Sequence, residues 1–371
     1  MLSVTGCKGR IARLAAALNP GLDGVVITRP EQLLYFANFF AAPNSLNLHS
    51  ASFLFIRRDG TTTLFTDNWL GPVAGTAADE IIVVDWYTMQ SPARLRQQAV
   101  ASNVAAHLRS LGARAIGGEL SALPSLIGRA VADVVDLEPL LQSLREVKDP
   151  DEIDAMRLAM KTAEAIHAFS RVLLQPGFRE IDFYAMLLDR ATRAAERPFV
   201  MMCDLVSGER ALQCGGPPTT RRMREGELVI LDIFPYVDGY RADITNTLCV
   251  GGRPSAAQSD AFASVEAALA AGTALLRPGV PVQEVFEAME REILKSSYGS
   301  PLPGHGGHGL GLGHPESPHV VRSSDRTLAS GMVIALEPGI YHPAVGGIRI
   351  ENNYLVGPNG AERLSNHRLA L

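Results

Sequence analysis

The chain of 371 residues is long enough for two domains of ordinary size. Its net charge of −5 argues against nucleic acid or an anionic membrane surface as the main partner, because both select for a basic face. No apolar run approaches the ~20 residues that cross a membrane, and the first residues lack the pattern of a secretory signal. Four scattered cysteines without a CxxC pair favour reduced thiols, so we expect a cytoplasmic protein.

The pattern of residues 1–145 predicts an α/β domain. Short apolar runs are typical of strands, and helical patterns alternate with them. The expected strands are 24–28, 52–56, 62–66 and 80–86, and the expected helices are 8–18, 30–39 and 92–112.

A second domain, residues 146–371, is expected to begin with a helix. Asp149 can cap this helix, with Pro150 in its first position and Glu152 three residues after the cap. Further helices are expected over 181–196, 255–276 and 281–297, and strands over 227–237, 240–250, 332–341 and 347–356. This order is typical of an α+β fold with a curved antiparallel sheet.

The dipeptide Asp238-Gly239 is a strong signal for a tight hairpin turn. A two-residue turn there places Val237 opposite Tyr240 and, counting outward, Asp232 opposite Thr245. The turn therefore predicts the register of the two strands that it joins.

In that register Asp243 lies on the same face as Asp232, roughly 7–8 Å away between Cα atoms. Two carboxylates at this spacing can reach one pair of metal ions. The alternatives are that Asp232 caps a turn and that Asp243 forms a surface ion pair with Arg241. Asp232 lies within an apolar run, however, and a buried aspartate needs a cation or several hydrogen bonds.

Two glutamates also lie in apolar surroundings. Glu337 directly precedes Pro338 at the end of an apolar run. Alternation puts Arg349 and Glu351 on one strand face, where Arg349 can stabilise Glu351. A structural Arg–Glu pair is the alternative interpretation.

Residues 304–314, GHGGHGLGLGH, contain three histidines. GHGGHG formally matches GxGxxG, but a dinucleotide site needs a helix to follow, and Pro315 and Pro318 oppose one. We interpret the glycines as scaffolding that allows the backbone to approach a metal pair and a substrate.

Two aspartates, two glutamates and one histidine form a hard, oxygen-rich set of ligands. Four carboxylates in one cavity repel one another and take up protons unless cations are bound. Two divalent ions neutralise all four charges, and the oxygen ligands favour Mn²⁺ over a structural zinc.

The order of these residues in LDIF, GYRADITNT, GHGLG, ALEPG and GIRIENN resembles the pita-bread metallohydrolases, which include methionine aminopeptidase, prolidase, aminopeptidase P and creatinase. The resemblance implies a creatinase-like α/β domain over 1–145 and a pita-bread catalytic domain over 146–371. It implies two divalent metal ions, Mn²⁺ first and Co²⁺ or Zn²⁺ as alternatives, and a homodimer. The implied metal ligands are Asp232, Asp243, His308, Glu337 and Glu351.

The resemblance also implies hydrolysis of an Xaa-Pro bond in a small peptide. The two ions lower the pKa of a shared water, the resulting hydroxide attacks the scissile carbonyl, and Glu337 carries the proton. The alternatives are a creatinase-like hydrolase of a non-peptide C–N bond and a binding module that has lost catalysis.

The sequence departs from the family around the substrate. Cys214 stands where these peptidases often carry a histidine, and His305 and His314 are each displaced by one residue from the prolidase pattern. We expect His314 to act in substrate binding and catalysis, with Arg349 and Cys214 also on the substrate side. Cys214 has no assigned base that would make it a nucleophile.

The other histidines of this part of the chain are interpreted as surface or loop residues. They are His305, His319 and His342.

Overall fold

The computed structural model describes residues 2–39, 51–68, 75–93 and 95–371. The chain divides into two compact units, Met1–Arg145 and Glu146–Leu371, and each is considered by itself. None of the described helices is both long and apolar enough to cross a membrane.

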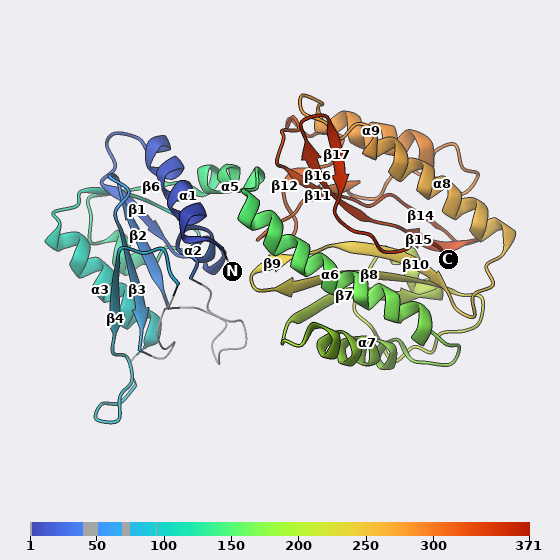
Figure 1. Cartoon of the computed structure of the whole chain (residues 1–371), viewed down its shortest axis with the longest axis horizontal. Coiled ribbons are helices and arrows are strands. Elements are labelled where there is room, and N and C mark those ends of the chain that lie inside the picture. The colour runs from blue at the N-terminus through green and yellow to red at the C-terminus, as the bar shows by residue number, and fades with distance from the viewer. Residues whose placement is uncertain (1, 40–50, 69–74, 94) are drawn as a thin grey trace. The chain divides into compact units, whose positions relative to one another are not determined.

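The first unit is built on a six-stranded mixed sheet in the order β4-β3-β2-β1-β5-β6 (Figure 1). The neighbours β1/β2 and β2/β3 are antiparallel, and the other three neighbouring pairs are parallel. The strands are β1 (Gly24–Ile27), β2 (Phe53–Arg57), β3 (Thr62–Asp67), β4 (Glu80–Val84), β5 (Ala115–Gly118) and β6 (Asp133–Asp136). The four predicted strands are confirmed to within two residues at each end.

The described helices that accompany this sheet are α1 (Val4–Ala17), α2 (Pro30–Ala37), α3 (Arg96–Ser110), α4 (Ser125–Gly128) and α5 (Glu138–Glu146). Helix α3 was expected from residue 92 but begins at Arg96, because Leu95 has extended backbone angles. Residue 94 lies outside the described residues. Val100, Val104 and Leu108 on α3 belong to one buried cluster with phenylalanines of β2 and β3, so the amphipathic face of this helix covers the sheet.

The second unit begins with α6 (Pro150–Leu173), which has the predicted start. Asp149 and Glu152 form a capping box, and Pro150 takes the first helical position. Helix α7 (Glu180–Ala195) packs against α6, and both contact strands of the sheet that follows (Figure 1).

The first sheet of this unit has the order β10-β8-β7, with β9 also paired to β8. Its strands are β7 (Val200–Ser207), β8 (Leu228–Val237), β9 (Tyr240–Arg241) and β10 (Ile244–Cys249), and the 3₁₀ helix η1 (Gly208–Gln213) follows β7. Asp238 and Gly239 have φ angles of 48° and 95°, as a type I′ turn requires. Val237 pairs with Tyr240 and Asp232 with Thr245, so the predicted register is confirmed without a bulge.

The second sheet is antiparallel in the order β12-β11-β13-β16-β17, and β14 and β15 form a separate hairpin. The strands are β11 (Gly307–Gly309), β12 (Glu316–His319), β13 (Val333–Leu336), β14 (Gly339–His342), β15 (Gly346–Arg349), β16 (Asn352–Gly357) and β17 (Gly360–Arg363). Helices α8 (Ala256–Thr273) and α9 (Val282–Ile293) pack together, and α8 contacts β13, β14 and β15 (Figure 1).

Two strands that were expected to be continuous are each divided. The run 332–341 breaks at Glu337-Pro338 between β13 and β14, and the run 347–356 breaks at Ile350-Glu351 between β15 and β16. At each break the chain ends its pairing with one strand and begins pairing with a different strand. Both glutamates therefore lie between strands rather than within a regular strand.

Candidate metal centre

Six side chains from separate elements of the second unit bring their ligand atoms together. They form three overlapping groups in which all ligand atoms lie within 4.8 Å of one another. The groups are Asp243, His308 and His314; His308, Glu337 and Glu351; and Asp232, Asp243 and Glu351. The structure thus brings together the five expected ligands and adds His314.

Asp243 is the most connected member of this cluster. Its Oδ2 lies 2.6 Å from His314 Nε2 and 3.2 Å from His308 Nε2. Asn353 holds the backbone of Asp243 at both polar atoms, accepting from the amide at 3.0 Å and donating to the carbonyl at 2.5 Å. The alternative of a surface ion pair with Arg241 is wrong, because Asp243 is buried and Arg241 lies over the ring of Tyr236.

The two glutamates approach the same point from the second sheet. Glu351 accepts a hydrogen bond from Thr245 Oγ1 at 2.8 Å, and its backbone amide donates to the carbonyl of Thr245 at 3.0 Å. Glu337 Oε1 lies 3.5 Å from His308 Nε2. Thr245 faces Asp232 across the first sheet, so this contact joins the two sheets at the site.

Arg349 has a different partner from the expected one. Its Nη2 donates to Asp232 Oδ2 at 2.5 Å, and its Nη1 donates to the carbonyl of Cys214 at 2.7 Å. Among the described residues no direct ion pair joins Arg349 to Glu351. Burial raises the pKa of Glu351, and the charge of Arg349 acts in the opposite direction, so the expected stabilisation is electrostatic rather than a direct pair. Arg349 therefore anchors the far side of the carboxylate of Asp232.

Each of the four carboxylates retains one buried oxygen that accepts no hydrogen bond. These atoms are Asp232 Oδ1, Asp243 Oδ1, Glu337 Oε1 and Glu351 Oε1. A buried acceptor without a partner costs about 1–3 kcal/mol, and more when it is charged. Four such oxygens around an imidazole suit hard divalent cations, so the residues present fit a metal centre.

The electrostatics of the cluster lead to the same conclusion. Burial raises the pKa of Asp232 and Glu351 well above the usual values, and repulsion by Asp243 and Glu337 adds to the effect. Burial opposes ionisation of Asp243 too, but the charges and hydrogen bonds of His314 and His308 outweigh it and lower its pKa. Cations at this site would replace those protons.

His308 Nε2 points at the carboxylates because His308 is held between two strands. Its Nδ1 is 2.9 Å from the carbonyl oxygen of Gly309, and Asp243 raises the pKa of its ring to about 9 against the effect of burial. A Cβ on Gly307 would lie 2.0 Å from the carbonyl oxygen of Ala335, and one on Gly309 would lie 2.2 Å from that of Ser317. The missing side chains at these two positions therefore make room for neighbouring strands. The expectation was that the glycines make room for a metal pair or a substrate.

The remaining histidines of this part of the chain differ in how close they lie to the cluster. The ring of His314 stacks on Phe234 with centroids 4.7 Å apart, and its side chain is 19% exposed, so it borders the cluster. His305 lies on a loop with its side chain 43% exposed and is absent from the three ligand groups, as expected, although its Nδ1 is 3.3 Å from Glu337 Oε1. His319 is exposed on β12, and His342 is next to Tyr298.

No helix follows His308 within residues 310–371, all of which are described. The requirement of a dinucleotide-binding loop for a helix after its glycines is therefore not met.

Cys214 lies at the edge of the cluster in an unusual backbone conformation, with a φ of 70°. Its carbonyl accepts from Arg349, and burial raises the pKa of its thiol. A thiol with a raised pKa is a poor nucleophile near neutral pH. The raised pKa disfavours thiolate chemistry at Cys214, whose backbone carbonyl holds Arg349.

Two polar residues beside the cluster were not anticipated. Tyr341 is a neighbour of Arg349, and burial raises its pKa to about 12. Asp204 on β7 pairs directly with Asp232 on β8. No tight turn joins β7 to β8, so the sequence contains no local signal for that register.

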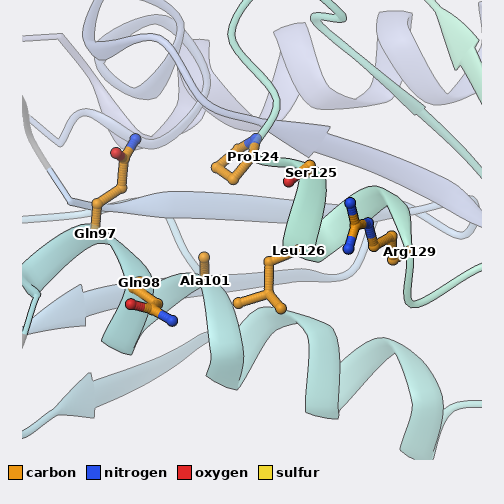
Figure 2. A pocket seen from close by; sticks show the side chains of 7 residues that line it. All are labelled: Gln97, Gln98, Ala101, Pro124, Ser125, Leu126 and Arg129. Atoms are coloured by element: carbon orange, nitrogen blue, oxygen red, sulfur yellow. The ribbon is translucent and has the colours of Figure 1, made fainter.

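A pocket in the first unit has a different character (Figure 2). It is lined by Gln97, Gln98, Ala101, Pro124, Ser125, Leu126 and Arg129. Arg129 is the one charged residue among them, so this pocket lacks the carboxylates and imidazoles that hydrolytic or metal chemistry requires.

Comparisons with known proteins show the family to which this chain belongs. The model of metallopeptidase family M24 matches residues 154–358, and that of the creatinase/prolidase N-terminal domain matches residues 10–147. The chain belongs to metallopeptidase family M24, and it is an enzyme with the pita-bread fold.

Individual relatives cover almost the whole chain. A probable dipeptidase PepE of Mycobacterium bovis is 30% identical over 96% of this chain and 94% of its own. The structure of the Xaa-Pro dipeptidase from Bacillus anthracis is 26% identical, with a TM-score of 0.83 and coverage of 98% of this chain and 99% of that chain. The prolidase from Pyrococcus horikoshii OT3 has a TM-score of 0.81 at 22% identity, covers 98% of this chain and 99% of that chain, and supports the fold alone.

Proposed function

We propose that this enzyme is a two-metal hydrolase of Xaa-Pro bonds in small peptides. The observation that carries the proposal is the set of four buried carboxylates, each with an oxygen that accepts no hydrogen bond, around His308. The choice of an Xaa-Pro bond is supported by the similarity to the Xaa-Pro dipeptidase, and the choice of a small peptide by the similarity to the probable dipeptidase PepE.

The ligand groups suggest how two ions would be shared. Asp232, Asp243 and Glu351 would hold one ion, and His308, Glu337 and Glu351 would hold the other. Bound there, such ions supply a nucleophilic water near neutral pH and polarise a carbonyl oxygen. The hard oxygen ligands favour Mn²⁺, with Co²⁺ and Zn²⁺ as alternatives.

Two residues of the cluster are placed for the remaining steps. The side chain of Glu337 is 12% exposed, the highest value among the three carboxylates Asp232, Asp243 and Glu337. We assign it the transfer of the proton from the nucleophile to the leaving nitrogen. His314, held against Asp243 and Phe234 at the border of the cluster, would donate a hydrogen bond to the oxygen that becomes negative in the transition state.

A substrate panel tests the proposal. Metal-free protein is loaded with Mn²⁺, Co²⁺ or Zn²⁺ and assayed with Ala-Pro, with a longer Xaa-Pro peptide and with Ala-Ala, which lacks proline. Turnover of a proline substrate above that of Ala-Ala is expected. Absence of turnover of every proline substrate would sink the proposal, and turnover of creatine instead would favour a non-peptide C–N hydrolase.

A further inference from the structure

Asp204 is a further carboxylate beside the metal centre and is not one of its ligands. Strands β7 and β8 pair Asp204 directly with Asp232, so the two side chains project from the same face of the sheet. Asp204 is absent from the three groups of ligand atoms that lie within 4.8 Å. Its side chain is 33% exposed, compared with 9% for Asp232.

The charge of Asp204 has one partner among the described residues, the guanidinium of Arg349, and the contact is long. Arg349 Nη2 is 3.8 Å from Asp204 Oδ2, beyond hydrogen-bond distance, while the same nitrogen is 2.5 Å from Asp232 Oδ2. No hydrogen bond to the carboxylate of Asp204 occurs in the described parts of the chain. Asp204 therefore presents an accessible acceptor at the edge of the cluster.

The backbone opposite makes room for this carboxylate. A Cβ added to Gly215 would lie 2.1 Å from Asp204 Oδ2 and 2.8 Å from its Cγ. Any side chain at residue 215 would displace the carboxylate from its position. Gly215 directly follows Cys214, whose carbonyl accepts from Arg349, so the segment that anchors Arg349 also leaves space for Asp204.

We propose that Asp204 is a specificity-determining residue that binds a cationic nitrogen of the substrate. This inference rests on the proposed hydrolysis of small peptides and adds a preference for charge to it. A partly exposed carboxylate with no donor of its own gains a charge-assisted hydrogen bond when an ammonium group approaches. The ammonium group is either the free α-amino group of the substrate or a basic side chain, and both have the same chemistry.

Matched substrates separate these two sources. Lys-Pro and norleucyl-Pro differ by the side-chain ammonium group, and Ala-Pro and propionyl-Pro differ by the α-ammonium group. In the wild-type enzyme we expect kcat/KM to favour the charged member of at least one pair by about tenfold or more, the size of a hydrogen bond to a charged group. The pair that shows the preference identifies the source.

Two variants and one control test the residue itself. Asp204→Asn keeps the shape and removes the charge, and Gly215→Ala displaces the carboxylate. Both variants should reduce the preference for the charged substrate to within about twofold. The change should appear in KM rather than kcat, because the ion pair is present in the ground state and in the transition state, and its loss weakens the binding of both equally. Asp189→Asn removes an exposed charge on α7 and should leave the preference unchanged.

A binding measurement keeps this inference separate from the proposed function. The thermal shift of Mn²⁺-loaded protein is compared between lysine and norleucine, and between alaninamide and propionamide. In the wild type the cationic member of a pair should raise Tm more than the neutral member does. In Asp204→Asn the two members should raise Tm equally. This result is expected even if no proline substrate is hydrolysed. The inference fails if the wild type shows no preference for either cation, or if Asp204→Asn retains it.

A purely structural role predicts a different pattern. If Asp204 only positioned Arg349, Asp204→Asn would lower metal content and kcat equally for charged and neutral substrates. That result would overturn the inference.

Discussion

Buried carboxylates in the first unit and those of the site in the second unit differ in the hydrogen bonds that their oxygens accept. In the first unit Asp67 is fully buried and accepts two hydrogen bonds from Arg96, at 2.6 and 3.1 Å. Glu119 accepts from both donors of Thr28 and from the amide of Arg29, so one of its oxygens has three donors.

The candidate metal centre of the second unit lacks this neutralisation, because each of its four carboxylates has one buried oxygen that accepts no hydrogen bond. Burial alone does not mark the site, because Glu180 in the same unit is equally buried and accepts from Ser207, Thr219 and Arg210. The useful signal is a group of buried acids whose oxygens have no donors, which indicates a place for cations.

The largest effect is expected from removing a carboxylate of the metal centre. Asp243→Ala or Glu337→Ala should lower kcat/KM on the order of a thousandfold or more, because ion binding or proton transfer is lost. Far-UV circular dichroism should show that the fold is retained, and Asp189→Asn serves as a matched control outside the site. A variant with near-normal turnover would overturn the site assignment.

A carboxylate of the first unit should matter for stability instead. Asp67→Ala leaves Arg96, whose side chain is 9% exposed, without its acid, and should lower the free energy of unfolding by about 3–5 kcal/mol. Both tryptophans of the chain, at positions 69 and 86, belong to the first unit, so tryptophan fluorescence in a urea titration follows its unfolding.

The contrasting variant is Glu351→Gln in the metal-free protein. It removes an acid whose ionisation is opposed by burial and by Asp243 and Glu337, and it keeps an acceptor for Thr245, so it should not destabilise the second unit. A loss as large as that of Asp67→Ala would remove the distinction between paired and unpaired acids.

Metal binding should stabilise the second unit by an intermediate amount. At a free Mn²⁺ concentration of 100 times Kd, one site adds about 2.7 kcal/mol to the free energy of unfolding. Differential scanning calorimetry with and without a chelator measures this change. Binding should also release protons, because Asp232 and Glu351 have raised pKa values without ions. An unchanged Tm together with no proton release would contradict a metal centre here.

The smallest effect concerns His167 and His367, which stack with ring centroids 4.8 Å apart and are both buried. Burial lowers the pKa of His167 to about 4 and that of His367 to about 2. Each ring is neutral in the folded chain but takes up a proton in the unfolded chain below about pH 6.5. Their contribution to stability is therefore complete above pH 6.5 and is lost as the pH falls toward the folded values.

Between pH 7.5 and 5.5 each histidine should lower the free energy of unfolding by about 1 kcal/mol. Urea titrations of metal-free wild type and His167→Gln at the two pH values measure the difference. The variant should lose less stability on acidification than the wild type. An equal loss in both proteins would mean that His167 does not titrate as its burial indicates.

Short-range interactions explain which parts of the fold could be predicted. The turn Asp238-Gly239 requires positive φ angles at adjacent residues, and from this turn the register of Asp232 and Thr245 follows by counting. The capping box of α6 likewise depends on residues three apart in the chain. The order of acids and His308 indicated a metal centre through the resemblance to a family, although spacing along the chain does not define distances in space.

The sequence by itself determined many of the helices and strands, the one hairpin register and the types of side chain available for chemistry. Only the tertiary structure decided that Arg349 pairs with Asp232 rather than Glu351, that His305 reaches Glu337 and that Asp204 lies beside Asp232. Each of these contacts joins segments that no tight turn connects, and a shift of one residue in a strand moves its side chains to the opposite face. Their positions therefore depend on the packing of whole sheets.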